Sequence, residues 1–311
     1  MTRAAIASSV KVWFLSLRPY SFTASLMPIL LAAAVVFVMQ RKGELSAPLW
    51  VTFPLFAVAG VLFHAGTNVL NDYYDYIHGV DSEGDVDPTH LLTRGLVTPK
   101  FMHRTGHIYF AVGVLVGVTI GIWRGPVFVG AGIVAASAAY FYTSRHLSLK
   151  YLALGDIVVF LLLGPAMVAM GTWALTGAIP MYAVAVSLPV AFLVTAIMHG
   201  NNLRDVETDK VEGILTLAGL IGRRASKHLL SFLLLAPFAV TVGLVGTGTL
   251  HPVAILSFGA LIPAVRLMKK VYRAKESAAL ALLPLSCAFV HIVFSSLFLG
   301  ALVLEGLVFT G

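Results

Sequence analysis

Nine stretches of mostly apolar residues, each about 20 residues long, dominate the chain and match the length needed to cross a bilayer. They lie near residues 20–39, 50–70, 107–123, 127–143, 156–176, 181–200, 228–246, 251–268 and 280–304. Only helices and closed barrels can cross lipid, because every backbone polar group must be paired inside the structure. The stretches lack the alternation of barrel strands, so the sequence predicts nine transmembrane helices in one domain, residues 1–311.

The composition agrees with this prediction. Hydrophobic residues make up 59% of the chain and charged residues only 11%, whereas a soluble domain carries roughly 25% charged residues. The single cysteine, Cys287, cannot form an internal disulfide. We expect the first apolar run, about residues 22–39, to be a retained helix and not a cleaved signal. The net charge of +7 fits cytoplasmic loops, and we expect no nucleic-acid partner.

The basic residues predict how the chain lies in the membrane. With nine spans, the N-terminus shares one side with the loops 2–3, 4–5, 6–7 and 8–9. Of the 21 lysines and arginines, all but Arg41, Lys42 and Arg124 fall on that side. Loops rich in lysine and arginine stay in the cytoplasm. We therefore expect an integral membrane protein, in the inner membrane if bacterial, whose N-terminus is cytoplasmic.

Ten of the 14 acidic residues follow the second and sixth apolar stretches, and five of these ten lie in two short acidic segments directly at the ends of the stretches. The segments read Asn68-Val69-Leu70-Asn71-Asp72-Tyr73-Tyr74-Asp75 and His199-Gly200-Asn201-Asn202-Leu203-Arg204-Asp205-Val206-Glu207-Thr208-Asp209. Each continues an apolar helix without a breaker, and residues four apart on a helix share a face. Asn71 therefore points with Asp75, and Asn201 points with Asp205 and Asp209. We interpret the segments as equivalent parts of two weakly repeated halves that face each other across a cavity.

Carboxylate and amide oxygens at this density favour a hard cation. Mg²⁺ binds through one or two carboxylates, keeps several waters and completes its shell with phosphate oxygens, so two such ions could hold a diphosphate leaving group. The predicted metal ligands are Asn71, Asp75, Asn201, Asp205 and Asp209. The predicted catalytic carboxylates are Asp72, Asp75, Asp205 and Asp209. The predicted diphosphate-binding residues are Lys150, Arg204 and Asn202. Further candidates are Asn68, Asp81 and Asp156.

Simpler interpretations of these residues stay open. Ordinary solvated charge suits the acids farther into the loops: Glu83, Asp85, Asp87 and Glu212. Lys150 could be a cytoplasmic membrane anchor. Asp156 is predicted to be the one acid outside the two clusters that lies within a span, where acids are functional candidates. It could instead be an N-terminal helix acid near the interface. His64 and His199, at matched depths, are predicted to pack or hydrogen-bond.

Several motifs together resemble the UbiA-type superfamily of membrane prenyltransferases, and most closely its menaquinone-forming branch. The motifs are Leu17-Arg18-Pro19-Tyr20-Ser21-Phe22, Asn71-Asp72-Tyr73-Tyr74-Asp75 with Gly79-Val80-Asp81, Lys150-Tyr151-Leu152-Ala153-Leu154-Gly155-Asp156, and Asn201 to Asp209 with Gly213-Ile214-Leu215-Thr216-Leu217-Ala218. Ubiquinone-type members tend to carry an aspartate where this chain has Gly79, and several branches carry an Arg-Pro pair where residues 91–99 stand. Both departures favour the naphthoate branch and leave open whether Asp81 replaces the missing ligand.

The resemblance implies a bundle of nine helices around a central cavity, capped on the cytoplasmic side by the 2–3 and 6–7 loops. It implies Mg²⁺-dependent transfer of a polyprenyl group from its diphosphate to an aromatic acid, 1,4-dihydroxy-2-naphthoate in menaquinone biosynthesis. One alternative is another aromatic acceptor. The other is a secondary transporter, which repeated halves with paired acidic sites also suit. Transporter sites lie near the midplane, whereas these acids follow the cytoplasmic helix ends.

Overall fold

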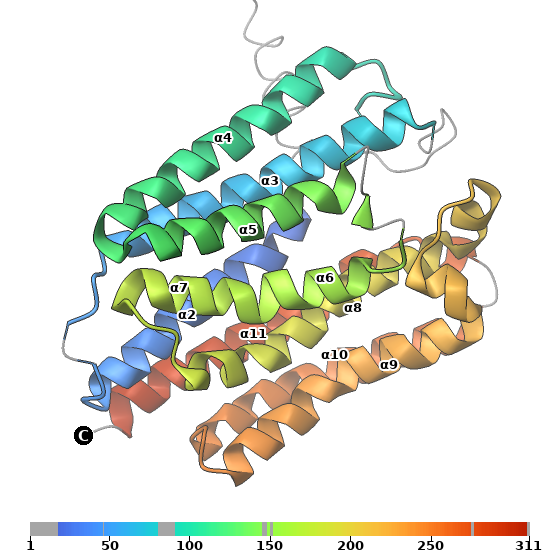
Figure 1. Ribbon diagram of the computed structural model, residues 1–311. Helices are drawn as coiled ribbons and strands as arrows, with labels where there is room; N and C mark the ends of the chain where they lie inside the picture. Colours follow the sequence, from blue (N-terminus) through green and yellow to red (C-terminus); the bar gives the residue numbers. More distant parts are fainter. Residues whose placement is uncertain are drawn as a thin grey trace, which may run out of the picture.

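The computed structural model describes residues 18–45, 47–79, 91–144, 148–149, 152–274 and 277–309, and this part of the chain forms a helical bundle (Figure 1). The long helices are α2 (Thr23–Arg41), α3 (Thr52–Ile77), α4 (Pro99–Arg124), α5 (Pro126–Thr143), α6 (Gly155–Leu161), α7 (Met167–Thr176), α8 (Met181–Val211), α9 (Leu217–Gly246), α10 (Leu261–Arg273) and α11 (Leu283–Val308). The short segments are η1 (Pro19–Phe22), η3 (Leu162–Ala166), η4 (Pro252–Ala260) and η5 (Ser277–Leu280). The segments α6, η3 and α7 make one span, and η4 with α10 makes another, so the described residues contain nine spans, as predicted.

Local signals explain where the helices begin and end. Gly125 adopts φ 81°, a conformation that glycine tolerates without strain, and Pro126 follows as the first residue of α5. This break separates the third and fourth spans at the predicted place. Thr98 caps α4 by accepting a hydrogen bond from the Phe101 amide, and Pro99 again occupies the first turn.

Three helices form the interior of the bundle. The apolar windows of α2 and α8 are 61% buried and that of α11 is 50% buried, against 22% for α5. Leu31, Leu193 and Phe294 of these three helices are almost fully inaccessible and belong to one core cluster. Figure 1 shows α3, α4 and α5 along one side of this interior and α9 with α10 along the other. The outer helices therefore leave most of their apolar surface for lipid.

The helices α3 and α8 finish at the same end of the bundle, which we call the mouth (Figure 1). Both run past their apolar stretches, so the two acidic segments lie on helices as predicted. The connections before α6 and after α8 meet here, because the Ala153 amide donates to the Leu215 carbonyl oxygen at 2.9 Å. Ala153 has φ 57°, an unusual conformation for a residue with a Cβ. Residues 80–90 of the 2–3 loop lie outside the described residues, so its role as a cap stays a prediction.

Candidate functional site

The first acidic segment lies in the last turns of α3, where both of its aspartates are buried. Asp72 is 2% exposed and Asp75 is 8% exposed. The Asn71 amide nitrogen donates to an Asp75 carboxylate oxygen at 2.8 Å, which confirms that these two side chains share a face. Thr143 at the end of α5 donates to the Asn71 amide oxygen at 3.2 Å. The guanidinium of Arg18, which precedes η1, is paired with the Asp72 carboxylate. The segment is therefore fixed from two sides, by α5 and by the start of the chain's first span.

Asn68, one turn earlier on α3, belongs to a different polar group. Its amide donates to the Ser21 hydroxyl at 2.9 Å, and that hydroxyl lies 3.2 Å from Nε2 of His64. Nδ1 of His64 lies 2.9 Å from the Ser25 hydroxyl. His64 thus serves as the hydrogen-bonding residue that the sequence predicted. Asn68 helps to join α3 to η1 and α2.

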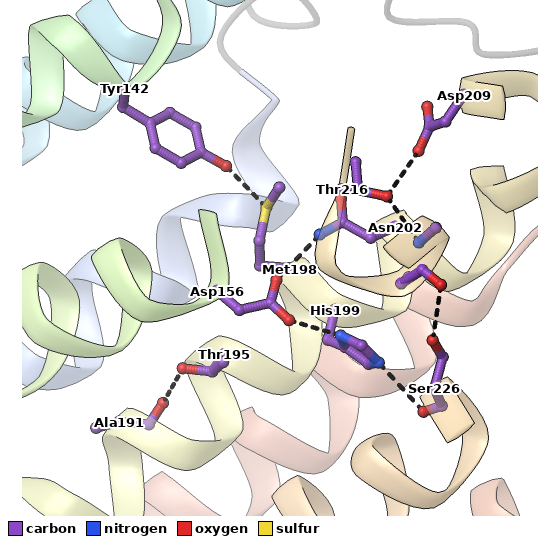
Figure 2. Close-up of polar contacts among 12 residues, drawn as sticks. Tyr142, Asp156, Ala191, Thr195, Met198, His199, Asn202, Asp209, Thr216 and Ser226 are labelled. Atoms are coloured by element: carbon purple, nitrogen blue, oxygen red, sulfur yellow. Dashed lines mark hydrogen bonds and ion pairs between the residues drawn. The ribbon is translucent and has the colours of Figure 1, made fainter. Parts of the chain in front are cut away.

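The second acidic segment forms the last turns of α8. Nε and Nη2 of Arg204 donate to the two carboxylate oxygens of Asp205, both at 2.7 Å. These side chains are 29% and 37% exposed, so solvent screens the pair and its contribution to stability is small, roughly 1 kcal/mol or less. Asp209 accepts a hydrogen bond of 3.4 Å from Thr216, the residue that caps α9 through the Gly219 amide (Figure 2).

Asp156 lies at the centre of a buried polar cluster that joins three helices (Figure 2). One of its carboxylate oxygens lies 2.6 Å from Nδ1 of His199, and the other accepts from the Asn202 amide at 3.0 Å. Nε2 of His199 lies 3.1 Å from the Ser226 carbonyl oxygen. A carbonyl oxygen only accepts, so Nε2 of His199 donates this hydrogen bond. Asp156 is therefore more than a surface acid at a helix N-terminus, since it ties α6 to α8 and, through His199, to α9.

Tyr142 of α5 connects the two acidic regions. Its hydroxyl donates to the Met198 sulfur of α8 at 3.1 Å (Figure 2). Its neighbour Thr143 donates to the Asn71 amide oxygen of the first acidic segment. The end of α5 therefore contacts the first acidic segment and also Met198, the residue just before the second acidic segment. Tyr142 could not be predicted from the sequence, because nothing in the apolar run of α5 distinguishes it from Tyr140.

The structure brings some predicted site residues together and leaves others apart. It joins Asn71 to Asp75 and Asn202 to Asp156. Across the described ranges, no three histidine, cysteine, aspartate or glutamate side chains lie in a group that could hold a metal ion. Lys150 and Asp81 lie outside the described residues. The carboxylate and amide oxygens present are nevertheless of the type that Mg²⁺ prefers.

One sequence expectation is wrong. Asp156 is not the one acid within a span outside the two clusters, because Glu305 lies inside α11 and is 2% exposed. The predicted span stopped at residue 304, and Glu305 was therefore overlooked. Its carboxylate pairs with the Lys42 ammonium at 2.8 Å, which offsets the cost of burying the charge at the end opposite the mouth.

The two departures from the ubiquinone-type pattern have structural reasons. Gly79 has φ 72° and follows the last helical residues of α3, so it ends the helix in a conformation that an aspartate would adopt only with strain. Leu91 and Leu92 are buried, and Leu92 packs with Val69 and Met102 between α3 and α4. The segment 91–99 therefore forms a packed turn that leads into α4.

The fold and the site together define a polytopic helical membrane protein with two acidic helix ends at one mouth. Residues 25–293 match the UbiA prenyltransferase family, so the chain belongs to this family and is a prenyltransferase. Membership favours the enzyme over the secondary transporter.

Curated relatives agree with this assignment. The UbiA prenyltransferase domain-containing protein 1 homolog of Drosophila melanogaster is 35% identical over 237 residues, which cover 74% of this chain and 64% of that protein. The corresponding protein of Danio rerio is 30% identical and is covered to 68%, with 75% of this chain aligned. The chain thus spans about two thirds of the length of these relatives.

Solved structures share the fold at low sequence identity. A UbiA homolog from Aeropyrum pernix K1, in its apo form, superposes with a TM-score of 0.65 at 15% identity, covering 87% of this chain and 96% of that one. A UbiA homolog from Archaeoglobus fulgidus bound to GPP and Mg²⁺ gives a TM-score of 0.57 at 15% identity, covering 92% and 99%. These similarities concern the fold alone.

Proposed function

We propose that this protein, acting as a single domain, transfers a polyprenyl group from its diphosphate to 1,4-dihydroxy-2-naphthoate with the help of Mg²⁺. The observation that carries the proposal is that both acidic segments finish at the same end of the bundle, where Asn71 is hydrogen-bonded to Asp75 and Arg204 to Asp205. A relative of the same fold is described as bound to GPP and Mg²⁺. A prenyl diphosphate and Mg²⁺ are therefore reasonable ligands for this mouth.

The Mg²⁺ ligands of the first motif are proposed to be Asn71 and Asp75. Their side chains are already hydrogen-bonded to each other and are held by Thr143. Asp72, paired with Arg18, supports this arrangement and fixes the end of α3. Bound Mg²⁺ would supply positive charge that stabilises the departing diphosphate.

The second motif is proposed to rearrange when substrate arrives. Asp205 and Arg204 now neutralise each other, and the exposed pair costs little to separate. Asp205, with Asn201 and Asp209, can then ligate metal. Arg204 can donate two parallel hydrogen bonds to diphosphate oxygens, for which its planar guanidinium is well suited. Lys150 remains a proposed second cation for the same diphosphate.

The acceptor is proposed from the motif resemblance and from the two departures explained above. The allylic carbon–oxygen bond breaks and its electrons leave with the diphosphate. The electron-rich ring then forms the new carbon–carbon bond, and loss of the ring carboxylate as carbon dioxide accompanies this step. We further propose that the mouth faces the cytoplasm, because 18 of the 21 lysines and arginines were assigned to that side.

A substrate panel tests the proposal directly. Purified protein in detergent is incubated with Mg²⁺, polyprenyl diphosphates of several lengths, and either dihydroxynaphthoate or 4-hydroxybenzoate. We expect a prenylated, decarboxylated naphthalene product and little product from the benzoate. Transfer to the benzoate alone would replace the proposed acceptor and leave the family assignment intact.

A further inference from the structure

Four cations line one face of α10, the helix that completes the eighth span at the mouth. Arg266, Lys269, Lys270 and Arg273 are all exposed, and their spacing of three, four and seven residues places them on a single stripe. No aspartate or glutamate occurs in α10. The stripe, here called the cationic face of α10, therefore carries four positive charges within two turns.

Packing holds this face outward. On the opposite side of α10, Ala264, Leu267 and Val271 are buried, and the helix packs against α9 and α11. The Tyr272 hydroxyl lies 2.8 Å from Nδ1 of His228 on α9. The helix therefore cannot turn its cations toward the protein without losing its buried contacts.

Helix capping accounts for only part of this charge. Cations in a last turn interact favourably with the negative end of the helix dipole, which covers Lys270 and Arg273. The carbonyl of Ala274, just beyond the helix, already accepts a hydrogen bond of 2.7 Å from the Lys227 ammonium. Arg266 lies two turns from the helix end, where the dipole effect has faded. The helix dipole therefore explains two of the four cations, Lys270 and Arg273, and leaves the exposed charge of the other two unexplained.

The position of the face suits the level of lipid headgroups. The span of η4 and α10 comprises 22 residues, about the length that crosses the hydrocarbon core. Its last turn therefore reaches the polar interface, and the long Arg266 side chain can extend its charge to the same level. The candidate site is built mainly by α3, α5, α6 and α8, and among its elements only α9, which contributes the Ser226 carbonyl, packs against α10. The buried side of α10 faces α9 and α11, so the cationic face points outward from the bundle.

We infer that the cationic face of α10 binds the phosphate headgroups of acidic membrane lipids in the leaflet at the mouth. Four or more lysines and arginines on an amphipathic helix beside a membrane are typical of such binding. The flanking exposed Ile262 and Tyr272 supply apolar and interfacial contact for the same lipid.

The test uses the full-length protein in a neutral detergent, titrated with short-chain phosphatidylglycerol or phosphatidylcholine and followed by its thermal unfolding temperature. We expect phosphatidylglycerol to bind more tightly than phosphatidylcholine. The variant Lys269→Gln with Lys270→Gln should bind phosphatidylglycerol about 30-fold more weakly, since each cation near an anionic surface contributes roughly fivefold. The variant Lys269→Arg with Lys270→Arg should retain the affinity of the native protein.

A matched control comes from α4, where Lys100 and Arg104 are also exposed and four residues apart at the mouth. Replacing both with glutamine should leave phosphatidylglycerol binding within about twofold of the native value.

If the α10 glutamine variant is too unstable to purify, Arg266→Gln with Arg273→Gln tests the same face. Equal binding of the two lipids, or equal losses in the α10 and α4 variants, would overturn the inference. Displacement of phosphatidylglycerol by inorganic diphosphate at low concentration would also overturn it, because the face would then be a site for free phosphate.

Discussion

At the scale of single residues, the buried partners of Asp156 give the clearest stability prediction. Asp156→Ala removes the acceptor of both the His199 ring and the Asn202 amide. Each buried polar group left without its partner costs about 1–3 kcal/mol. We expect the free energy of unfolding to fall by about 3 kcal/mol, measured by thermal or denaturant unfolding in detergent. Thr195→Val is the control, because the Thr195 hydroxyl donates to a carbonyl oxygen of its own helix. This substitution should lower the free energy of unfolding by less than about 1 kcal/mol. A loss no larger than that of the control would contradict the proposed tie between α6, α8 and α9.

The pair between Arg18 and Asp72 should also matter more for stability than ion pairs at the surface. Asp72→Asn leaves the Arg18 guanidinium, only 19% exposed, beside a neutral amide. Breaking one side of a buried pair typically costs about 3 kcal/mol. Glu207→Gln is the comparison, since Glu207 is 65% exposed and lies 3.9 Å from Arg223. We expect the unfolding temperature to fall clearly for the first variant and to stay nearly unchanged for the second; equal shifts would argue against a special role for Arg18.

At the scale of helices, the fifth span contains a break that holds it close to α8. The π-helical segment η3 includes Gly164, whose φ and ψ are both −106°, and a Cβ there would lie 2.3 Å from the Cβ of Ala191. We therefore expect Gly164→Ala to push α6 and α8 apart and to destabilise the protein by about 1–3 kcal/mol. Gly300→Ala in α11 should be neutral or slightly stabilising, since nothing lies within 4 Å of its added Cβ. Unfolding of the two variants in detergent compares them, and a neutral Gly164→Ala would show that the approach to α8 is not tight.

The helices themselves could be predicted well because lipid imposes a length and a composition on every span. Hydropathy located all nine spans of the described residues, including the third and fourth, which only a turn around Arg124 and Gly125 separates. Hydropathy alone does not mark the helix ends at the mouth, and it was the lack of a helix breaker that predicted the continuation of α3 and α8, which end at Ile77 and Val211. It also placed the end of the last span one residue before Glu305. Polar residues at a helix end carry no hydropathy signal, so their continuation depends on tertiary partners.

The site was predicted only in part, for a related reason. The spacing of four residues correctly paired Asn71 with Asp75, because local helix geometry alone decides that contact. The partners of Asp72 and Asp156 come from residues 54 and 43 positions away in the sequence, Arg18 and His199. A periodic pattern along the sequence cannot predict contacts between residues so far apart. Tyr142 was missed for the same reason, since its partner Met198 lies 56 positions away in the sequence.

At the scale of the whole molecule, the orientation in the membrane can be tested by chemical labelling. Cys287 is buried, and its replacement by alanine gives a cysteine-free background. Lys100→Cys lies at the mouth and Thr247→Cys at the opposite end, both at exposed positions. We expect an impermeant thiol reagent to label Lys100→Cys only in inverted vesicles and Thr247→Cys only in intact cells. The reverse pattern would place the mouth outside the cytoplasm.

Both acidic motifs are proposed to act together on one diphosphate through Mg²⁺. The most direct measurement is prenyl transfer by purified protein in excess Mg²⁺ and in excess chelator, for the native chain and for Asp75→Ala, Asp205→Ala and Glu207→Ala. We predict no turnover in chelator and at least about a 100-fold loss in each aspartate variant, because several kcal/mol of transition-state stabilisation depend on the metal. Glu207→Ala, which alters an exposed acid of the same segment, should keep most of the activity. Substantial transfer in chelator, or by either aspartate variant at equal protein amount, would contradict the account.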